Sequence, residues 1–124
     1  MERVATQPIA SGDNITQALR YLVEAACSAG PLDGMVLADR EGLVLAAAGD
    51  RDACAEVAQR VASMAIELAT FRGRVIGAEA AWPVAIRRAS VAGMGLYVAA
   101  IGGTSEVRDA QLARAVAGVE RLLA

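Results

Sequence analysis

Residues 33–50 place the strongest constraint on the fold. They read DGMVLADREGLVLAAAGD, in which two short apolar runs, 35–38 and 43–47, flank the polar residues 39–42. An Asp at the first position of a turn can hydrogen-bond its own backbone, and a Gly at the end supplies positive φ, so this spacing predicts a β-hairpin. Neither run alternates apolar with polar residues, so both faces of the resulting sheet have to be covered.

Three segments have the apolar spacing of a helix that buries one face. In the first, 13–29, apolar residues recur at i, i+3, i+4 and i+7, with Asp13 or Asn14 as the N-cap. The second covers 51–72, and the third covers 106–123 after Thr104 or Ser105 as its cap.

Three further segments, 74–80, 84–91 and 95–102, are predicted strands, and Pro83 marks a turn or the start of a strand. The predicted order is therefore helix, two strands, helix, three strands, helix. We expect residues 1–12 to be a flexible N-terminal tail and residues 13–124 to form one α/β (α+β) domain.

The second helix has more apolar surface than one sheet can cover. Its polar residues fall within one narrow stripe, whereas a helix lying on one sheet needs an apolar stripe of only ~100° or a little more. Part of the surplus consists of small residues: Ala55, Ala58, Ala62, Ala65 and Ala69. Small side chains let two helices approach closely, so we expect this stripe to contact a second copy of the chain. The alternative is that Ala is there only because it favours helix.

The residue inventory excludes most catalytic chemistry. With no His and no Lys, the chain lacks a Ser–His or Cys–His pair, an HExxH zinc site, a Schiff-base lysine and a Walker loop. We therefore predict a protein that is not an enzyme, with no catalytic residue, cofactor or metal. The carboxylate pairs Asp39/Glu41 and Asp50/Asp52 remain as an alternative, although nothing in the sequence buries them enough to shift their pKa values.

Charge and hydropathy bear on partners and location. All 12 basic residues are Arg, they are scattered, and the net charge is −2, so we expect no nucleic-acid partner. No apolar run reaches the ~20 residues of a membrane span, and the first residues lack the apolar core of a signal peptide. Cys27 and Cys54 fit buried small side chains better than a disulfide framework. We expect a cytoplasmic protein, and the Arg, Ala, Gly and Val bias indicates a bacterial source.

Three residues are candidates for contact with a partner. Trp82 is the only Trp and lies beside Pro83, where it could cover the core or anchor a partner. Arg87 and Arg88 point to opposite faces if their segment is extended, so one of them meets the protein or a partner.

The chain resembles the Roadblock (dynein light chain) family. Asp33-Gly34, then Asp39 to Gly42, then the run from Leu43 to Ala48 resemble its strand, its Asp-x-x-Gly turn and its second strand. The helix starting DACAEVAQRVASMA follows as in the family. The resemblance is good over 13–72, whereas 74–124 matches in element order more than in sequence.

The resemblance implies a single five-stranded antiparallel sheet with helices on both faces. It implies a homodimer joined through the second helix and the third strand, and bacterial members commonly regulate or bind Ras-like small GTPases. We therefore expect a homodimeric interaction or regulatory module that binds such a GTPase. The alternative is a profilin-like sensory module that binds a small ligand.

Overall fold

The computed structural model describes residues 7–64, 69–77, 80–91 and 93–124. The element order predicted from the sequence is confirmed. The elements are α1 (Gln7–Ala29), β1 (Gly34–Asp39), β2 (Val44–Gly49), α2 (Arg51–Met64), β3 (Thr70–Ile76), β4 (Ala81–Val91), β5 (Met94–Ile101) and α3 (Ser105–Leu122).

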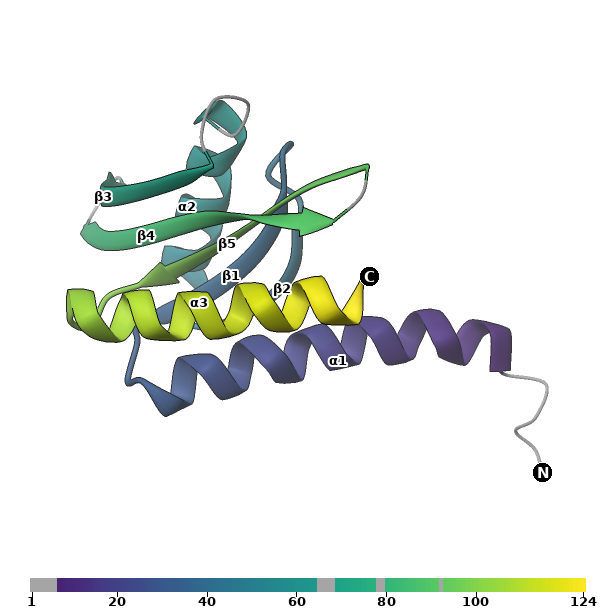
Figure 1. Cartoon of the computed structure of the whole chain (residues 1–124). Coiled ribbons are helices and arrows are strands. Elements are labelled where there is room, and N and C mark those ends of the chain that lie inside the picture. Colours follow the sequence, from purple (N-terminus) through teal and green to yellow (C-terminus); the bar gives the residue numbers. More distant parts are fainter. Residues whose placement is uncertain (1–6, 65–68, 78–79, 92) are drawn as a thin grey trace.

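The strands form one antiparallel sheet in the order β2-β1-β5-β4-β3 (Figure 1). Helices α1 and α3 lie side by side on one face, and α2 covers the other. The central strand β5 is buried at every position from Leu96 to Ile101, because helices cover it from both sides. The predicted fold, a five-stranded antiparallel sheet sandwiched by helices, is confirmed.

Alternating strand residues divide the core into two clusters. Met35 and Leu37 of β1 point toward α1 and α3, whereas Val36 and Ala38 point toward α2. The same alternation runs along β5, where Val98 joins the first cluster and the neighbouring residues join the second. The apolar residues on both faces of the first hairpin are therefore explained by two separate layers of packing.

The residues between β1 and β2 form the predicted turn. One carboxylate oxygen of Asp39, Oδ1, accepts backbone N–H groups from Glu41 at 2.9 Å and Leu43 at 3.0 Å. Gly42 takes a φ of 89°, which an L side chain rarely adopts. Asp39 and Gly42 thus serve the turn itself.

Two helix starts test the predicted caps. Thr104 caps α3, because its Oγ1 accepts the N–H of Val107 at 3.2 Å. The predicted cap of α1 is wrong: the helix begins at Gln7, six residues earlier than expected, and Asn14 lies inside it. Residues 7–12 are therefore helical rather than part of a tail. Asp13 and Asn14 are good capping residues, but a cap signal inside a segment that can remain helical does not fix where the helix starts.

The boundary between α2 and β3 also differs from the prediction. The segment from Thr70 is a strand, so the helix predicted over 51–72 does not extend to its expected end, and the strand predicted at 74–80 begins earlier. Thr70 pairs with Arg87 and Arg74 with Pro83, which places Pro83 inside β4 rather than before it. These pairings join residues far apart in sequence, so local periodicity did not reveal them.

Among the described residues, no helix is long and apolar enough to span a membrane.

Candidate functional site

Strand β3 and the outer side of α2 form one continuous surface at an edge of the sheet. β3 pairs with β4 along one side, and no strand of the described residues pairs with its other side, which makes it an edge strand. Arg60 of α2 reaches over to β3, where its Nη2 donates to the carbonyl of Ile76 at 2.8 Å. We call the residues of this region the α2–β3 surface: Ala55, Arg60, Ser63, Phe71, Arg74, Val75 and Ile76.

The α2–β3 surface has a hollow of about 360 Å³ between the helix and the strand. Phe71 and Val75 form its apolar wall, while Arg60 and Arg74 line its polar side. The side chain of Ile76 is 66% exposed at the rim. An open strand edge beside an exposed Ile and a partly apolar hollow has the composition of a protein interface.

The five alanines predicted to face a second copy have different environments. Ala55 is exposed on α2. Ala58 is buried in the chain's own core. Ala62 is half-buried next to Gly42, so close that a Cβ added to Gly42 would lie 3.2 Å from the Cβ of Ala62. Ala69 is exposed but precedes β3 outside the helix, and Ala65 lies outside the described residues. Part of the alanine stripe therefore packs against the β1–β2 turn of the same chain.

The three predicted partner residues lie in three places. Trp82 is half-buried against the α2 side of the core and opposite Val75 of β3, so it covers the core while keeping some exposed surface. Arg87 and Arg88 are both exposed and point to opposite faces of β4, as the sequence predicted. The structure does not bring these three side chains together.

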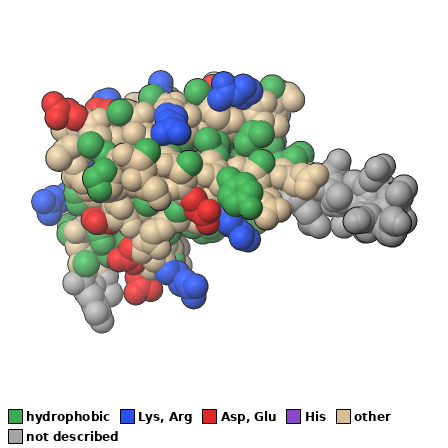
Figure 2. Space-filling view, turned by 90° about the horizontal axis from the view of Figure 1, so that it is seen from below, with side chains coloured by type: hydrophobic (Ala, Val, Ile, Leu, Met, Phe, Trp, Pro, Cys, Tyr) green, Lys and Arg blue, Asp and Glu red, His purple; other side chains and the backbone are tan. Residues whose placement is uncertain are grey.

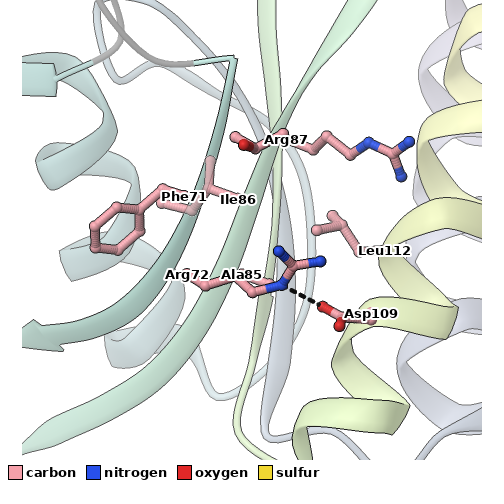
Figure 3. A pocket seen from close by; sticks show the side chains of 8 residues that line it. Phe71, Arg72, Ala85, Ile86, Arg87, Asp109 and Leu112 are labelled. Atoms are coloured by element: carbon pink, nitrogen blue, oxygen red, sulfur yellow. Dashed lines mark hydrogen bonds and ion pairs between the residues drawn. The ribbon is translucent and has the colours of Figure 1, made fainter.

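Arg87 lines a groove of about 230 Å³ between β3, β4 and α3 (Figure 3). Figure 3 shows the side chains of Arg72 and Arg87 extending from neighbouring strands toward α3, on either side of Leu112. Arg72 Nε lies 3.1 Å from Asp109 Oδ1, a pair whose side chains are 72% and 43% exposed. Such an exposed pair contributes less than about 1 kcal/mol, so it orients Arg72 more than it stabilises the fold.

Of the four carboxylates considered for catalysis, two have structural roles and two are simply exposed. Asp39 holds the β1–β2 turn. Asp50 caps α2, because its Oδ1 accepts the N–H groups of Asp52 at 2.9 Å and Ala53 at 3.1 Å. Glu41 and Asp52 are exposed. An Asp directly before a helix is a recognisable capping signal, so the sequence itself favours this role over half of a carboxylate pair.

Both cysteines are free and buried, as expected. Burial raises the pKa of the Cys54 thiol to about 11, and its Sγ donates weakly to the carbonyls of Ala48 at 3.4 Å and Met35 at 3.6 Å. Burial also raises the pKa of Cys27, with a smaller contribution from Asp33. These thiols are protonated at neutral pH and act as small core residues.

The described residues contain no group of three or more Cys, Asp or Glu side chains that could hold a metal ion. On the face formed by α1 and α3, acidic and basic side chains are interspersed with apolar ones (Figure 2). This mixed face has none of the continuous basic surface on which nucleic acids bind.

Comparison of the fold with solved structures gives clear matches. MglB of Myxococcus xanthus superposes with a TM-score of 0.65 at 10% identity, covering 86% of this chain and 88% of that one. A structure of MglB with a tetrameric arrangement gives 0.65 at 17% identity and covers 88% and 90%. A Roadblock/LC7 domain from Streptomyces avermitilis gives 0.57 at 21% identity and covers 84% and 96%.

The chain has a Roadblock fold. No family model matches the sequence, and no curated protein matches it significantly. At these identities the likeness establishes the Roadblock architecture rather than a shared activity. The resemblance of residues 33–50 to the Roadblock hairpin is thus supported by the whole sheet and all three helices.

The structure shows two features that the sequence did not single out. Ile76 was only the third residue of a predicted strand, and its exposure follows from the position of β3 at the sheet edge. Arg40 was assigned to the turn, yet its side chain lies across β5 beside Gly95. Neither position has a local sequence signal.

Proposed function

We propose that the chain is a homodimeric Roadblock module that binds a Ras-like small GTPase, as a regulator or a scaffold, with no catalytic role of its own. The observation that carries the proposal is the α2–β3 surface, which combines an open strand edge with exposed apolar side chains. The proposal places the protein in the cytoplasm, where such a partner would be found.

The homodimer is supported by the chemistry of β3. Two copies related by a twofold axis would pair β3 with β3 and satisfy the open backbone groups of both strands. The same contact would cover Ile76 and the hollow between α2 and β3. Ala55 would be a close-approach point between the two α2 helices, a smaller role than the five-alanine stripe suggested.

The GTPase partner is supported by the family resemblance. Bacterial Roadblock proteins commonly regulate or bind Ras-like GTPases, and two of the matched structures are MglB proteins. One of them is described with a tetrameric arrangement.

The dimer is tested with Ile76→Glu. The side chain is largely exposed within one chain, so the variant should fold with an unchanged circular dichroism spectrum. In the proposed dimer the carboxylate would be desolvated without a partner, at a cost of several kcal/mol. We expect the mass from size-exclusion chromatography with light scattering to change from two chains to one.

Tyr21→Glu is the matched control. Tyr21 is 61% exposed on α1, a helix that packs against β1, β2 and α3 rather than at the β3 edge. This variant should remain dimeric, because it adds the same charge outside the proposed interface. A monomeric wild-type chain at micromolar concentration, or an Ile76→Glu variant that stays dimeric, would contradict the proposed interface.

The GTPase is tested by affinity capture from the native lysate with either GDP or a non-hydrolysable GTP analogue, followed by mass spectrometry. Enrichment of an identified Ras-like GTPase in one nucleotide state would support the proposal, and the state would indicate which role to test. The captured GTPase should then bind in purified form. Failure of every GTPase encoded in the source genome to bind would refute this part.

The sensory alternative predicts a bound small molecule. Native mass spectrometry of the purified protein distinguishes the two, since a sensory module should carry extra mass from a copurified ligand. The GTPase-binding module should show the mass of the chains alone.

A further inference from the structure

A second hollow lies where the β1–β2 turn meets the β4–β5 hairpin. Its volume is about 540 Å³, within the range of protein binding clefts. Four of its residues carry the argument, and we call them together the two-arginine hollow: Arg40, Arg88, Ser90 and Gly95.

Strand register brings these residues to one face of the sheet. Ser90 of β4 pairs with Gly95 of β5, and Arg88 lies two residues before Ser90, so it points to the same side. Asp39 pairs with Leu96, which places the next residue of the turn, Arg40, beside Gly95. This is the face that α2 covers further along the sheet.

Gly95 leaves room for the Arg40 side chain beside β5. A Cβ at this position would be 2.8 Å from Nε of Arg40 and 3.3 Å from its Nη2. The absence of a side chain at this position lets the guanidinium lie directly on β5 in the observed position. Arg40 is thereby directed across the strand and into the same hollow as Arg88.

The two positive charges have no counterpart within the structure as described. Both arginines are exposed, and no described residue accepts a hydrogen bond from either guanidinium. The nearby Asp39 uses its Oδ1 in the turn. Glu120 of α3 accepts the N–H of Ser90 at 2.6 Å, but α3 lies on the opposite face of the sheet.

We propose that the two-arginine hollow binds an acidic segment of a partner protein. Each guanidinium presents a planar set of donors that fits a carboxylate, and two of them on one hollow fit a segment with two carboxylates. Met94, 48% exposed, and the half-buried Val91 also border the hollow. They pair with each other one position beyond Ser90 and Gly95, so their side chains point to the opposite face, where Val91 packs against the first core cluster. The contact at the hollow is therefore between charged groups.

This inference rests on the proposed function in one respect, which is that the chain binds a protein partner. It adds the chemistry of that partner's surface and locates a contact on the α2 side of the sheet. It does not depend on β3 pairing or on the nucleotide state of a GTPase.

The test uses the full chain with ¹⁵N-labelled arginine and glycine. The probe is the pentapeptide Gly-Glu-Leu-Glu-Gly, blocked at both ends, and the control probe has Gln in place of both Glu residues. We expect the acidic probe to shift the Nε–Hε signals of Arg40 and Arg88 and the backbone amides of Gly93 and Gly95, whereas the control probe leaves them unchanged.

Variants then assign the effect to the arginines. Arg40→Gln and Arg88→Gln should each weaken binding of the acidic probe by about fivefold, as expected for one exposed charge pair. Arg114→Gln, on exposed α3, should bind like the wild type. Raising the ionic strength from about 0.01 M to about 1 M should abolish binding, since the screening length falls from about 30 Å to about 3 Å.

Three results would overturn the proposal. Equal shifts with the Gln probe would remove the role of the carboxylates. Shifts spread over all arginines would show general charge attraction, and tighter binding of inorganic phosphate than of the acidic probe would show a small-anion site. The proposed function fails separately: a monomeric mass or absence of GTPase binding refutes it even when the acidic probe binds as expected.

Discussion

Replacing Asp50 by Ala should lower the stability of the fold by removing the N-cap of α2. Helix α2 begins at Arg51, and Asp50 is its N-cap. Its carboxylate accepts two backbone N–H groups of the first turn, and its own carbonyl accepts the N–H of Cys54 at 3.0 Å. The substitution leaves the carbonyl in place and removes only the side-chain acceptor.

The expected loss has two parts. Removing an N-cap side chain costs about 1 kcal/mol, within a range of about 0.5–2 kcal/mol. Removing a negative charge from the N-terminal end of a helix adds about 0.3–1 kcal/mol. Asp50 is exposed, so no cavity forms, and we expect a total of about 1.5 kcal/mol, or a fall in Tm of about 6 °C for a chain of this length.

Thermal and urea denaturation followed by circular dichroism measure this loss. Protein concentration has to be the same for every variant, because the stability of a dimer depends on it. Asp50→Ser keeps an acceptor and should recover most of the stability. Asp52→Ala removes a neighbouring exposed carboxylate that accepts no N–H of the first turn in the structure, and should cost less than about 1 kcal/mol.

Comparing the two Asp variants shows whether Asp50 stabilises α2 as its N-cap or only through its charge. If Asp52→Ala costs as much as Asp50→Ala, the loss reflects charge near the helix end and the capping argument is wrong. If both variants match the wild type, the first turn of α2 contributes nothing to stability.

Two further predictions concern the β1–β2 turn and the core. Gly42→Ala should destabilise the chain by about 1–2 kcal/mol, because Gly42 has φ 89° and an added Cβ would lie 3.1 Å from the Ala58 carbonyl oxygen. Gly93→Ala should cost less, because Gly93 also has a positive φ, 71°, but an added Cβ there would have nothing within 4 Å. Equal losses of stability in urea denaturation would show that the contact with Ala58 contributes nothing. Burial raises the pKa of Cys54 from 9.0 to about 11, so the folded state keeps a proton that the unfolded state loses, and the free energy of unfolding should fall between these pH values by at most about 2–3 kcal/mol. In the Cys54→Ala variant, denaturation at several pH values should not show this fall in the free energy of unfolding with pH. If the variant shows the same fall, another group causes it.

Local chemistry made several features predictable from the sequence. The β1–β2 turn follows from Asp39 and Gly42 because the Asp39 carboxylate accepts from Glu41 and Leu43, residues at most four positions away. The stripe of α3 and its Thr104 cap are equally local. The apolar residues on both faces of β1 required helices on both sides of the sheet, and the resemblance supplied the number and direction of the strands.

Other features could be seen only in the tertiary structure, because they depend on residues that are distant in the chain. The boundary between α2 and β3 is set by pairing of β3 with β4, and the place of β5 between β1 and β4 is set by packing on both faces. Helical spacing placed Ala58 in the predicted dimer interface, whereas the structure buries it in the chain's own core.

The candidate surfaces show the same division. The sequence determined which residue types were present, such as the arginines, the small residues of α2 and the absence of His and Lys. Only the fold decided that Ile76 is exposed at an edge and that Gly95 admits Arg40 beside the hollow lined by Arg88. Side-chain periodicity is a property of a single segment, whereas an edge, a close approach and a shared hollow exist only between segments that pair or pack together.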